Sequence, residues 1–83
     1  MSNPKRSLFR AGERYRAKES FVGIFENKFY AGTTYVFLSC KYSHYDGCFV
    51  YAFRPVEGGE RVEWWLPEDE PDDSWKTYFE VVE

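Results

Sequence analysis

The stretch TTYVFLSCKYSHYDGCFVYAFRPVEGGERVEWWL, residues 33–66, decides the fold. It is dense in β-branched and aromatic residues, which favour strands. Two dipeptides that contain glycine, Asp46-Gly47 and Gly58-Gly59, divide it into three segments. Both dipeptides are typical of type I′ turns, which join antiparallel strands through a two-residue loop. The stretch therefore predicts a meander of three antiparallel strands.

A two-residue loop also determines which residues face each other across a hairpin. The first turn would place Lys41 opposite Ala52. The second turn would place Ala52 opposite Trp65 and Arg54 opposite Glu63. Facing residues of opposite charge stabilise a strand pair, by about 0.2–1 kcal/mol in general. We therefore expect Arg54 and Glu63 to form an ion pair on the surface.

The two predicted registers assign the same residues to the same faces, because side chains alternate along a strand. One face is apolar or aromatic throughout and is the expected core: Val36, Leu38, Cys40, Tyr42, Phe49, Tyr51, Phe53, Val62, Trp64 and Leu66. The other face collects the charges and is the expected outer face: Phe37, Ser39, Lys41, Val50, Ala52, Arg54, Glu63 and Trp65. Agreement between independent turns is strong support for the meander.

Outside the meander, the 83-residue chain is predicted to add two further strands. Alternation over residues 13–21 predicts a first strand, and residues 21–32 are expected to form a long loop with aromatic anchors. Pro67 should end the last meander strand. Beyond it we expect a helical turn at Ser74–Thr77 and a closing strand at Tyr78–Val82.

The predicted fold is all-β: five short strands in a small SH3-like barrel, with a long loop after the first strand and a short helical turn near the C-terminus. Residues 9–83 should form this single domain, and residues 1–8, which are polar and contain Pro4, should form a flexible tail. Aromatic residues make up 22% of the chain, so a few large rings can supply most of the core of a domain this small.

A series of motifs follows a set order along the chain: Gly12-Glu13-x-Tyr15, Phe21, Gly32, the strand through Phe37, the hairpin Tyr42-x-x-Tyr45-Asp46-Gly47, and Tyr78-Phe79. In this order they resemble a group of small bacterial SH3-like β-barrel domains of uncharacterised function. The resemblance covers most of residues 8–82. It implies a compact β-barrel and a bacterial or phage origin. It implies no catalytic or binding residue, and the acidic run at 68–73 has no counterpart in it.

Charge is spread unevenly over a chain whose net charge is −3. Residues 1–19 carry six basic and two acidic side chains, whereas residues 57–83 carry ten acidic and two basic ones. Such asymmetry suggests a charged partner or an attraction between the two ends of the chain. No signal-peptide pattern and no apolar run of membrane-spanning length occurs in the sequence. We expect a cytoplasmic protein with reduced thiols and no membrane association.

The sequence offers little for catalysis or for metal binding. His44 is the only histidine, and it lies beside a predicted hairpin tip. Cys40, His44 and Cys48 have a zinc-like spacing, but the predicted register points the two cysteines to opposite faces, which also opposes a disulfide between them. The acidic run lacks the pattern of a calcium loop. We expect no enzyme activity, no metal and no cofactor.

The candidate binding surface centres on Trp65, because an exposed tryptophan near arginine is typical of interface hot spots. It comprises Phe37, Lys41, Arg54, Glu63 and Trp65, with the adjoining acids Glu68, Asp69, Glu70, Asp72 and Asp73. The predicted function is a non-catalytic protein-interaction module, with an acidic inhibitor or immunity-type protein that binds a basic partner as one form of it.

Three alternatives remain open from the sequence. The loop 21–32 or the C-terminal segment could cover Trp65 and form a second small core. The acidic run could be a solvated loop that keeps an aromatic domain soluble. The protein could instead bind single-stranded nucleic acid through its exposed aromatic residues. The identity of the partner and the oligomeric state are also open.

Overall fold

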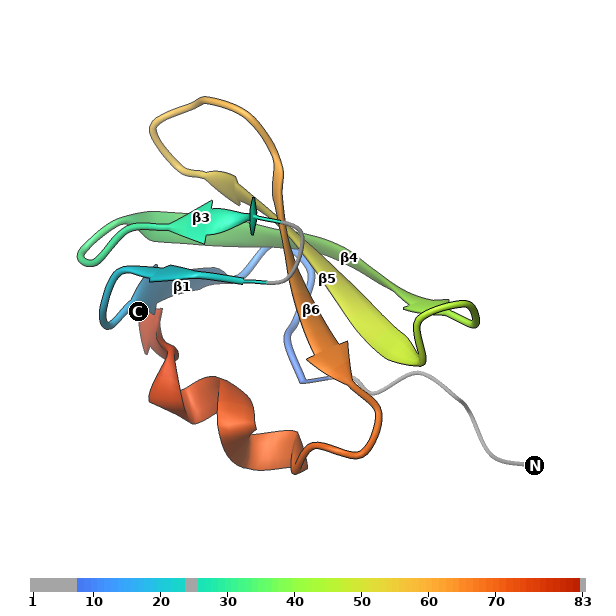
Figure 1. Cartoon of the computed structure of the whole chain (residues 1–83). Helices are drawn as coiled ribbons and strands as arrows, with labels where there is room; N and C mark the ends of the chain where they lie inside the picture. The colour runs from blue at the N-terminus through green and yellow to red at the C-terminus, as the bar shows by residue number, and fades with distance from the viewer. Residues whose placement is uncertain (1–7, 24–25, 83) are drawn as a thin grey trace.

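The computed structural model describes residues 8–23 and 26–82, and it is mainly β, as predicted (Figure 1). Its strands are β1 (Arg14–Ala17), β2 (Phe21–Val22), β3 (Lys28–Phe29), β4 (Thr34–Ser43), β5 (Cys48–Pro55), β6 (Val62–Pro67) and β7 (Phe79–Val82). A 3-10 helix, η2 (Asp72–Thr77), connects β6 to β7. The predicted helical turn and closing strand are therefore confirmed, and Pro67 ends its strand as expected.

Five strands form one antiparallel sheet in the order β6-β5-β4-β1-β7. The remaining two, β2 and β3, pair with each other in a small separate sheet, so the predicted long loop contains a short hairpin. The large sheet coils until its two edge strands approach through their side chains. The ring of Trp64 on β6 lies 5.5 Å from the ring of Phe79 on β7. Figure 1 shows η2 running across the open end of this coil.

Both long hairpins differ from the predicted registers by two residues. The first turn spans four residues, 44–47, and the second spans six, 56–61, instead of two each. Val50 consequently pairs with Lys41 on one side and with Trp65 on the other. A shift by an even number of residues leaves each side chain on its predicted face. Most of the predicted faces of the meander therefore hold, although the predicted partners were wrong.

A bulge in β4 is the exception to these faces. The register shifts between Phe37 and Ser39, so one extra residue interrupts the alternation of the strand. On the N-terminal side of the bulge, Tyr35 and Phe37 point into the core, while Val36 and Leu38 are half-buried. The prediction that Phe37 lies on the outer face was wrong, because no feature of a single strand's composition marks a bulge.

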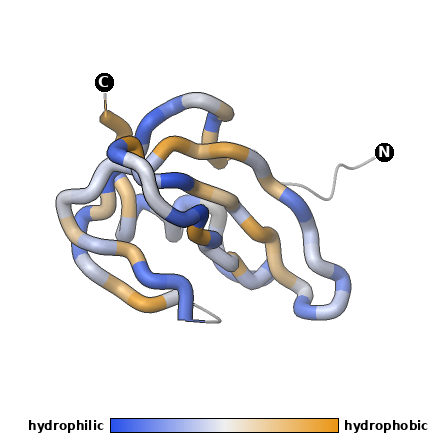
Figure 2. Tube along the Cα trace, turned by 90° about the horizontal axis from the view of Figure 1, so that it is seen from above, coloured by the Kyte–Doolittle hydropathy of each residue, from blue (hydrophilic) through white to orange (hydrophobic). Residues whose placement is uncertain are grey.

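The centre of the core is Phe9, whose side chain is only 5% exposed. Its ring lies within 4.9–6.0 Å of seven other aromatic rings: Tyr15, Phe37, Tyr51, Phe53, Trp64, Trp75 and Phe79. Leu8 also packs against the core, although we predicted it to be part of the flexible tail; the rest of that tail, residues 1–7, lies outside the described residues. Figure 2 shows hydrophobic residues along the strands and hydrophilic ones at several turns.

Strand β5, which lies between β6 and β4, is buried on both of its faces over residues 48–53. Phe49, Tyr51 and Phe53 point into the core, as predicted. On the opposite, outer face Val50 is 1% exposed and Ala52 is 2% exposed. Val50 lies between two larger cross-strand neighbours, Lys41 and Trp65. The side chains of these neighbours shield the smaller valine from water. Val50 and Ala52 are therefore shielded from solvent, although they lie outside the main core cluster.

The β2–β3 turn is attached to the edge strand β6. The side-chain oxygen Oδ1 of Asn27 accepts a hydrogen bond from the backbone N–H of Glu63 at 3.1 Å. Because β6 is an outermost strand of the sheet, this N–H has no neighbouring strand to bond to. Asn27 thus satisfies an edge donor and holds the small sheet against the large one.

Candidate functional site

The structure separates the predicted binding residues into groups rather than one surface. Phe37 is in the core and cannot contact a partner. Lys41, Glu63 and Trp65 share the outer face next to Val50, as predicted. Arg54 is exposed farther along the same face, where it pairs with Val36.

Trp65 is half-buried and its indole is held in place. Its Nε1–H donates a hydrogen bond to Oε1 of Glu63 at 3.2 Å. The other oxygen of this carboxylate, Oε2, accepts a hydrogen bond from Arg61 at 3.0 Å. The predicted ion pair between Arg54 and Glu63 is therefore wrong, because the shifted register places Ala52 opposite Glu63. Arg61, two residues before Glu63 in the chain, pairs with it instead.

The two extremes that we considered for Trp65, full exposure and full coverage, are both incorrect. Trp65 is half-exposed, and it lines a shallow hollow of about 220 Å³ between β6 and the C-terminal segment. Glu70, Ser74 and Tyr78 line the same hollow. The C-terminal segment thus lies beside Trp65 without closing over it.

The acidic run is attached to the tip of the β4–β5 hairpin. The backbone N–H of Glu68 donates to the carbonyl oxygen of Gly47 at 2.9 Å. A hydrogen bond between the Glu68 carboxylate and the Tyr42 hydroxyl raises the pKa of that tyrosine above its ordinary value, with burial as a smaller cause. Asp69 and Glu70 follow in an exposed turn. These contacts place the first acids of the run at one end of the molecule.

The hairpin tip adds an aromatic ring and a further carboxylate to this end. The side chain of Tyr45 is fully exposed, at 102% of its reference area. Next to it, Oδ2 of Asp46 accepts a hydrogen bond from the Ser43 hydroxyl at 2.8 Å, which holds the turn. We refer to Tyr45, Asp46, Glu68, Asp69 and Glu70 as the acidic hairpin end. The last predicted acids, Asp72 and Asp73, lie apart from it at the start of η2.

The buried thiol of Cys48 lies at the base of the acidic hairpin end. Its Sγ donates a hydrogen bond to the carbonyl oxygen of Asp46 at 3.3 Å. Burial raises the pKa of this thiol above its ordinary value of 9.0, and the carboxylates of Asp46, Asp69 and Glu68 raise it further. Both causes disfavour the charged thiolate. Cys48 is therefore a buried residue whose environment favours the neutral thiol.

The raised pKa of Cys48 predicts a loss of stability in alkali. The unfolded chain releases this thiol proton near pH 9.0, whereas the folded chain retains it to higher pH. The free energy of unfolding should therefore be unaffected below that pH and should fall as the pH rises through it. Urea unfolding at pH 7 and pH 10 measures the fall. A Cys48→Ala variant should lose less stability over the same interval; an equal loss would contradict the assignment.

Other chemistry has little support among the described residues. His44 is exposed, and its ring lies 4.9 Å from the ring of Tyr42. Cys40 and Cys48 are both free thiols. Across residues 8–23 and 26–82, no group of three histidine, cysteine or acidic side chains could hold a metal ion. No helix in this part of the chain is long and apolar enough to cross a membrane.

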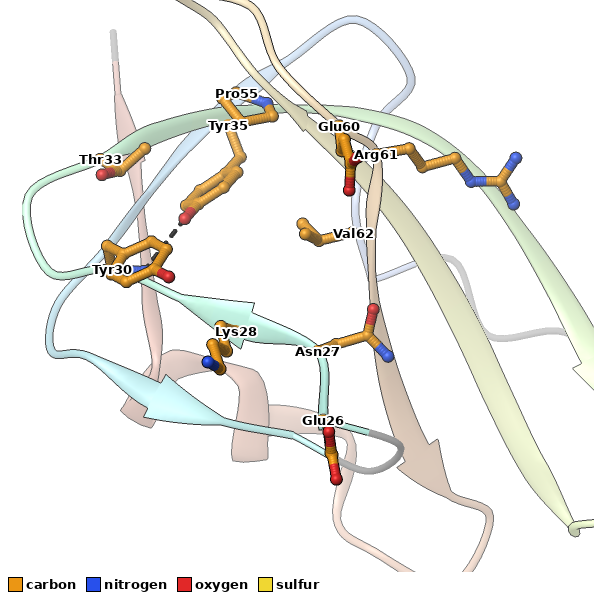
Figure 3. A pocket seen from close by; sticks show the side chains of 10 residues that line it. All are labelled: Glu26, Asn27, Lys28, Tyr30, Thr33, Tyr35, Pro55, Glu60, Arg61 and Val62. Atoms are coloured by element: carbon orange, nitrogen blue, oxygen red, sulfur yellow. Dashed lines mark hydrogen bonds between the residues drawn. The ribbon is translucent and has the colours of Figure 1, made fainter.

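A pocket that the sequence did not predict lies at the other end of β5 (Figure 3). It has a volume of about 400 Å³ and lies between β3 and the adjoining ends of β4, β5 and β6. Tyr35 and Val62 form its interior, and Tyr30 stands at its mouth. It could not be predicted because its walls come from four separate segments, whose approach depends on the Asn27 contact and on the position of the β4 bulge.

Comparison with known proteins identifies one informative similarity. No protein-family model and no curated protein matches the chain. The fold is similar to that of a solved structure from the mobile metagenome of Vibrio cholerae, an integron cassette protein. The TM-score is 0.70 with 18% sequence identity, over 95% of this chain and 94% of that one. The chain therefore shares its whole fold with a bacterial protein, and the similarity shows the fold alone.

Proposed function

We propose that this protein is a non-catalytic interaction module that binds a basic protein through the acidic hairpin end. One observation carries the proposal. Glu68 forms hydrogen bonds with Gly47 and Tyr42 of the β4–β5 hairpin, which hold the acidic turn beside the tip that carries the fully exposed Tyr45. Two segments whose backbones are already held side by side need less ordering when a partner binds.

The chemistry of this end suits the basic groove of a nucleic-acid-binding protein, as an inhibitor or immunity-type protein would require. A cluster of carboxylates attracts a cationic partner over a distance and accelerates its association. An exposed tyrosine is a rigid amphipathic anchor of the kind enriched in interface hot spots. The proposed binding surface is therefore the hairpin tip and not the Trp65 face that the sequence predicted. On that face the Trp65 indole is bonded to Glu63, which Arg61 also binds.

We further propose that the fold is an SH3-like barrel and that the protein is cytoplasmic. The approach of the edge strands through Trp64 and Phe79 supports the first proposal, because a barrel requires its two edges to meet. The free thiols of Cys40 and Cys48 support the second, since reduced cysteines are typical of the cytoplasm.

A pull-down with matched charge variants tests the proposed interaction. The triple variant D46N/E68Q/D69N should lose capture of a basic partner, such as a nuclease, by roughly tenfold or more, since each lost charge pair weakens binding. The control E13Q/E57Q/E60Q removes three exposed carboxylates elsewhere and should retain capture. Capture by the wild type should also weaken with salt.

The same experiment separates the proposal from its alternatives. Equal capture by both triple variants would show that the acidic hairpin end is not the docking surface. Quenching of tryptophan fluorescence by single-stranded polynucleotide would instead support nucleic-acid binding. We do not favour that function, because the carboxylates around Tyr45 would repel phosphate.

A further inference from the structure

The walls of the pocket shown in Figure 3 are fixed before any ligand arrives. The backbone N–H of Tyr30 donates to the hydroxyl of Tyr35 at 3.0 Å, which joins the segment after β3 to the base of β4. The bond from Glu63 to Asn27 joins the opposite side of the hairpin to β6. A pocket braced on both sides requires little rearrangement to bind a ligand.

The pocket is mainly apolar, although Asn27 and Thr33 also line it. Val62 and Pro55 supply its accessible apolar surface, since Tyr35 is only 1% exposed, and the Tyr30 ring at its mouth is 57% exposed. A volume of about 400 Å³ is within the usual range for small-molecule sites. An apolar body of moderate size, above all an aromatic one, can pack between these side chains.

Two residues of opposite charge line the pocket on opposite sides. Figure 3 shows Glu60 on one wall and Lys28 on the facing wall. Neither forms an ion pair or a hydrogen bond with any part of the chain that the structure describes. The other charged residues of the lining are directed elsewhere: Arg61 extends away to Glu63, and the carboxylate of Glu26 points away from the interior.

We propose that this pocket binds a small zwitterion of the amino-acid type with an aromatic or similarly bulky apolar side chain. Glu60 binds the ammonium group, Lys28 binds the carboxylate, and the side chain packs on Val62 and Pro55 beside Tyr30. A ligand with a single charge would meet one like charge in the pocket, whereas a zwitterion matches both. This activity goes beyond the proposed interaction module and uses none of its residues.

Titration of the full chain with L-phenylalanine, followed by amide NMR shifts, tests the proposal. We expect saturable shifts at Lys28, Tyr30 and Val62, with a Kd on the order of 1 mM for a ligand of this size. N-acetyl-L-phenylalanine lacks the ammonium group and L-phenylalaninamide lacks the carboxylate. Each should bind roughly tenfold more weakly, as the loss of one charge-assisted contact implies.

Variants assign each charge to its partner. Lys28→Gln should bind L-phenylalanine and its amide with equal affinity, and Glu60→Gln should bind L-phenylalanine and its N-acetyl derivative with equal affinity. The control Glu57→Gln alters an exposed carboxylate of the same loop outside the pocket and should behave as the wild type. Absence of saturable shifts up to about 20 mM, or equal affinity of the wild type for all three compounds, would overturn the proposal.

Discussion

A Phe9→Ala variant should lose a large part of the stability of the protein, more than any exposed substitution. Removing a buried phenylalanine side chain costs about 3–5 kcal/mol. At about 0.05–0.15 kcal/mol per residue, a chain of this length has only about 4–12 kcal/mol of stability in total. Seven aromatic rings surround Phe9, and they cannot all move inward to fill the space that its ring leaves. Urea unfolding and the loss of near-ultraviolet circular dichroism measure the effect.

Tyr45→Ala provides the control for Phe9. It removes a larger side chain, but one that is fully exposed, so its cost should be within about 0.5 kcal/mol. A Phe9→Leu variant should retain the fold with an intermediate loss of stability, because leucine keeps much of the buried volume. If Phe9→Ala were as stable as Tyr45→Ala, the central position of Phe9 in the core would be disproved.

The second large effect is expected at Val50, on the face of the sheet opposite the core. Val50→Asp should destabilise the protein by more than about 2 kcal/mol, because a carboxylate at this nearly inaccessible position loses its water, and the facing Lys41 offsets only part of that cost. If this face were merely a solvated surface, the same change would have little effect. The shift of the urea midpoint relative to the wild type distinguishes the two cases.

A neighbouring position serves as the control for Val50. Ser39 lies on the same face and is exposed, so Ser39→Asp introduces the same carboxylate where water can solvate it. Its effect should stay within about 0.5 kcal/mol. Equal destabilisation by the two aspartates would show that the charge of the face matters and not its packing.

The fold could be predicted largely because it depends on alternation. Val62, Trp64 and Leu66 had to share one face whichever turn preceded them, and an even register error does not change that result. The turns were harder to predict. Asp46-Gly47 suggested a two-residue loop, but the chain uses four residues, with the N–H of Gly47 bonded to the carbonyl oxygen of Ser43.

What could not be predicted depends on contacts that are distant in the sequence. Phe9 follows a polar segment, and nothing local indicates that the coiled sheet leaves a space of its size at the centre. The bulge near Leu38 moves Phe37 inward, although Phe37 has the same composition signal as its neighbours. The acidic run was recognised as a feature from its charge. Its position against the hairpin tip depends on the hydrogen bond between Glu68 and Gly47, which no periodicity encodes.

The contact between Asn27 and the outermost strand β6 has a consequence for self-association. The segment VEWWL in β6 is rich in aromatic and β-branched residues, a composition that favours fibril-like stacking of exposed strands. Backbone N–H groups alternate along a strand, so those at Glu63, Trp65 and position 67 would point to the open edge. Asn27 occupies the first, and Pro67 has no N–H to offer. Acids then follow directly and repel a second copy, so the chain protects its most aggregation-prone edge with one amide, one proline and a run of negative charge.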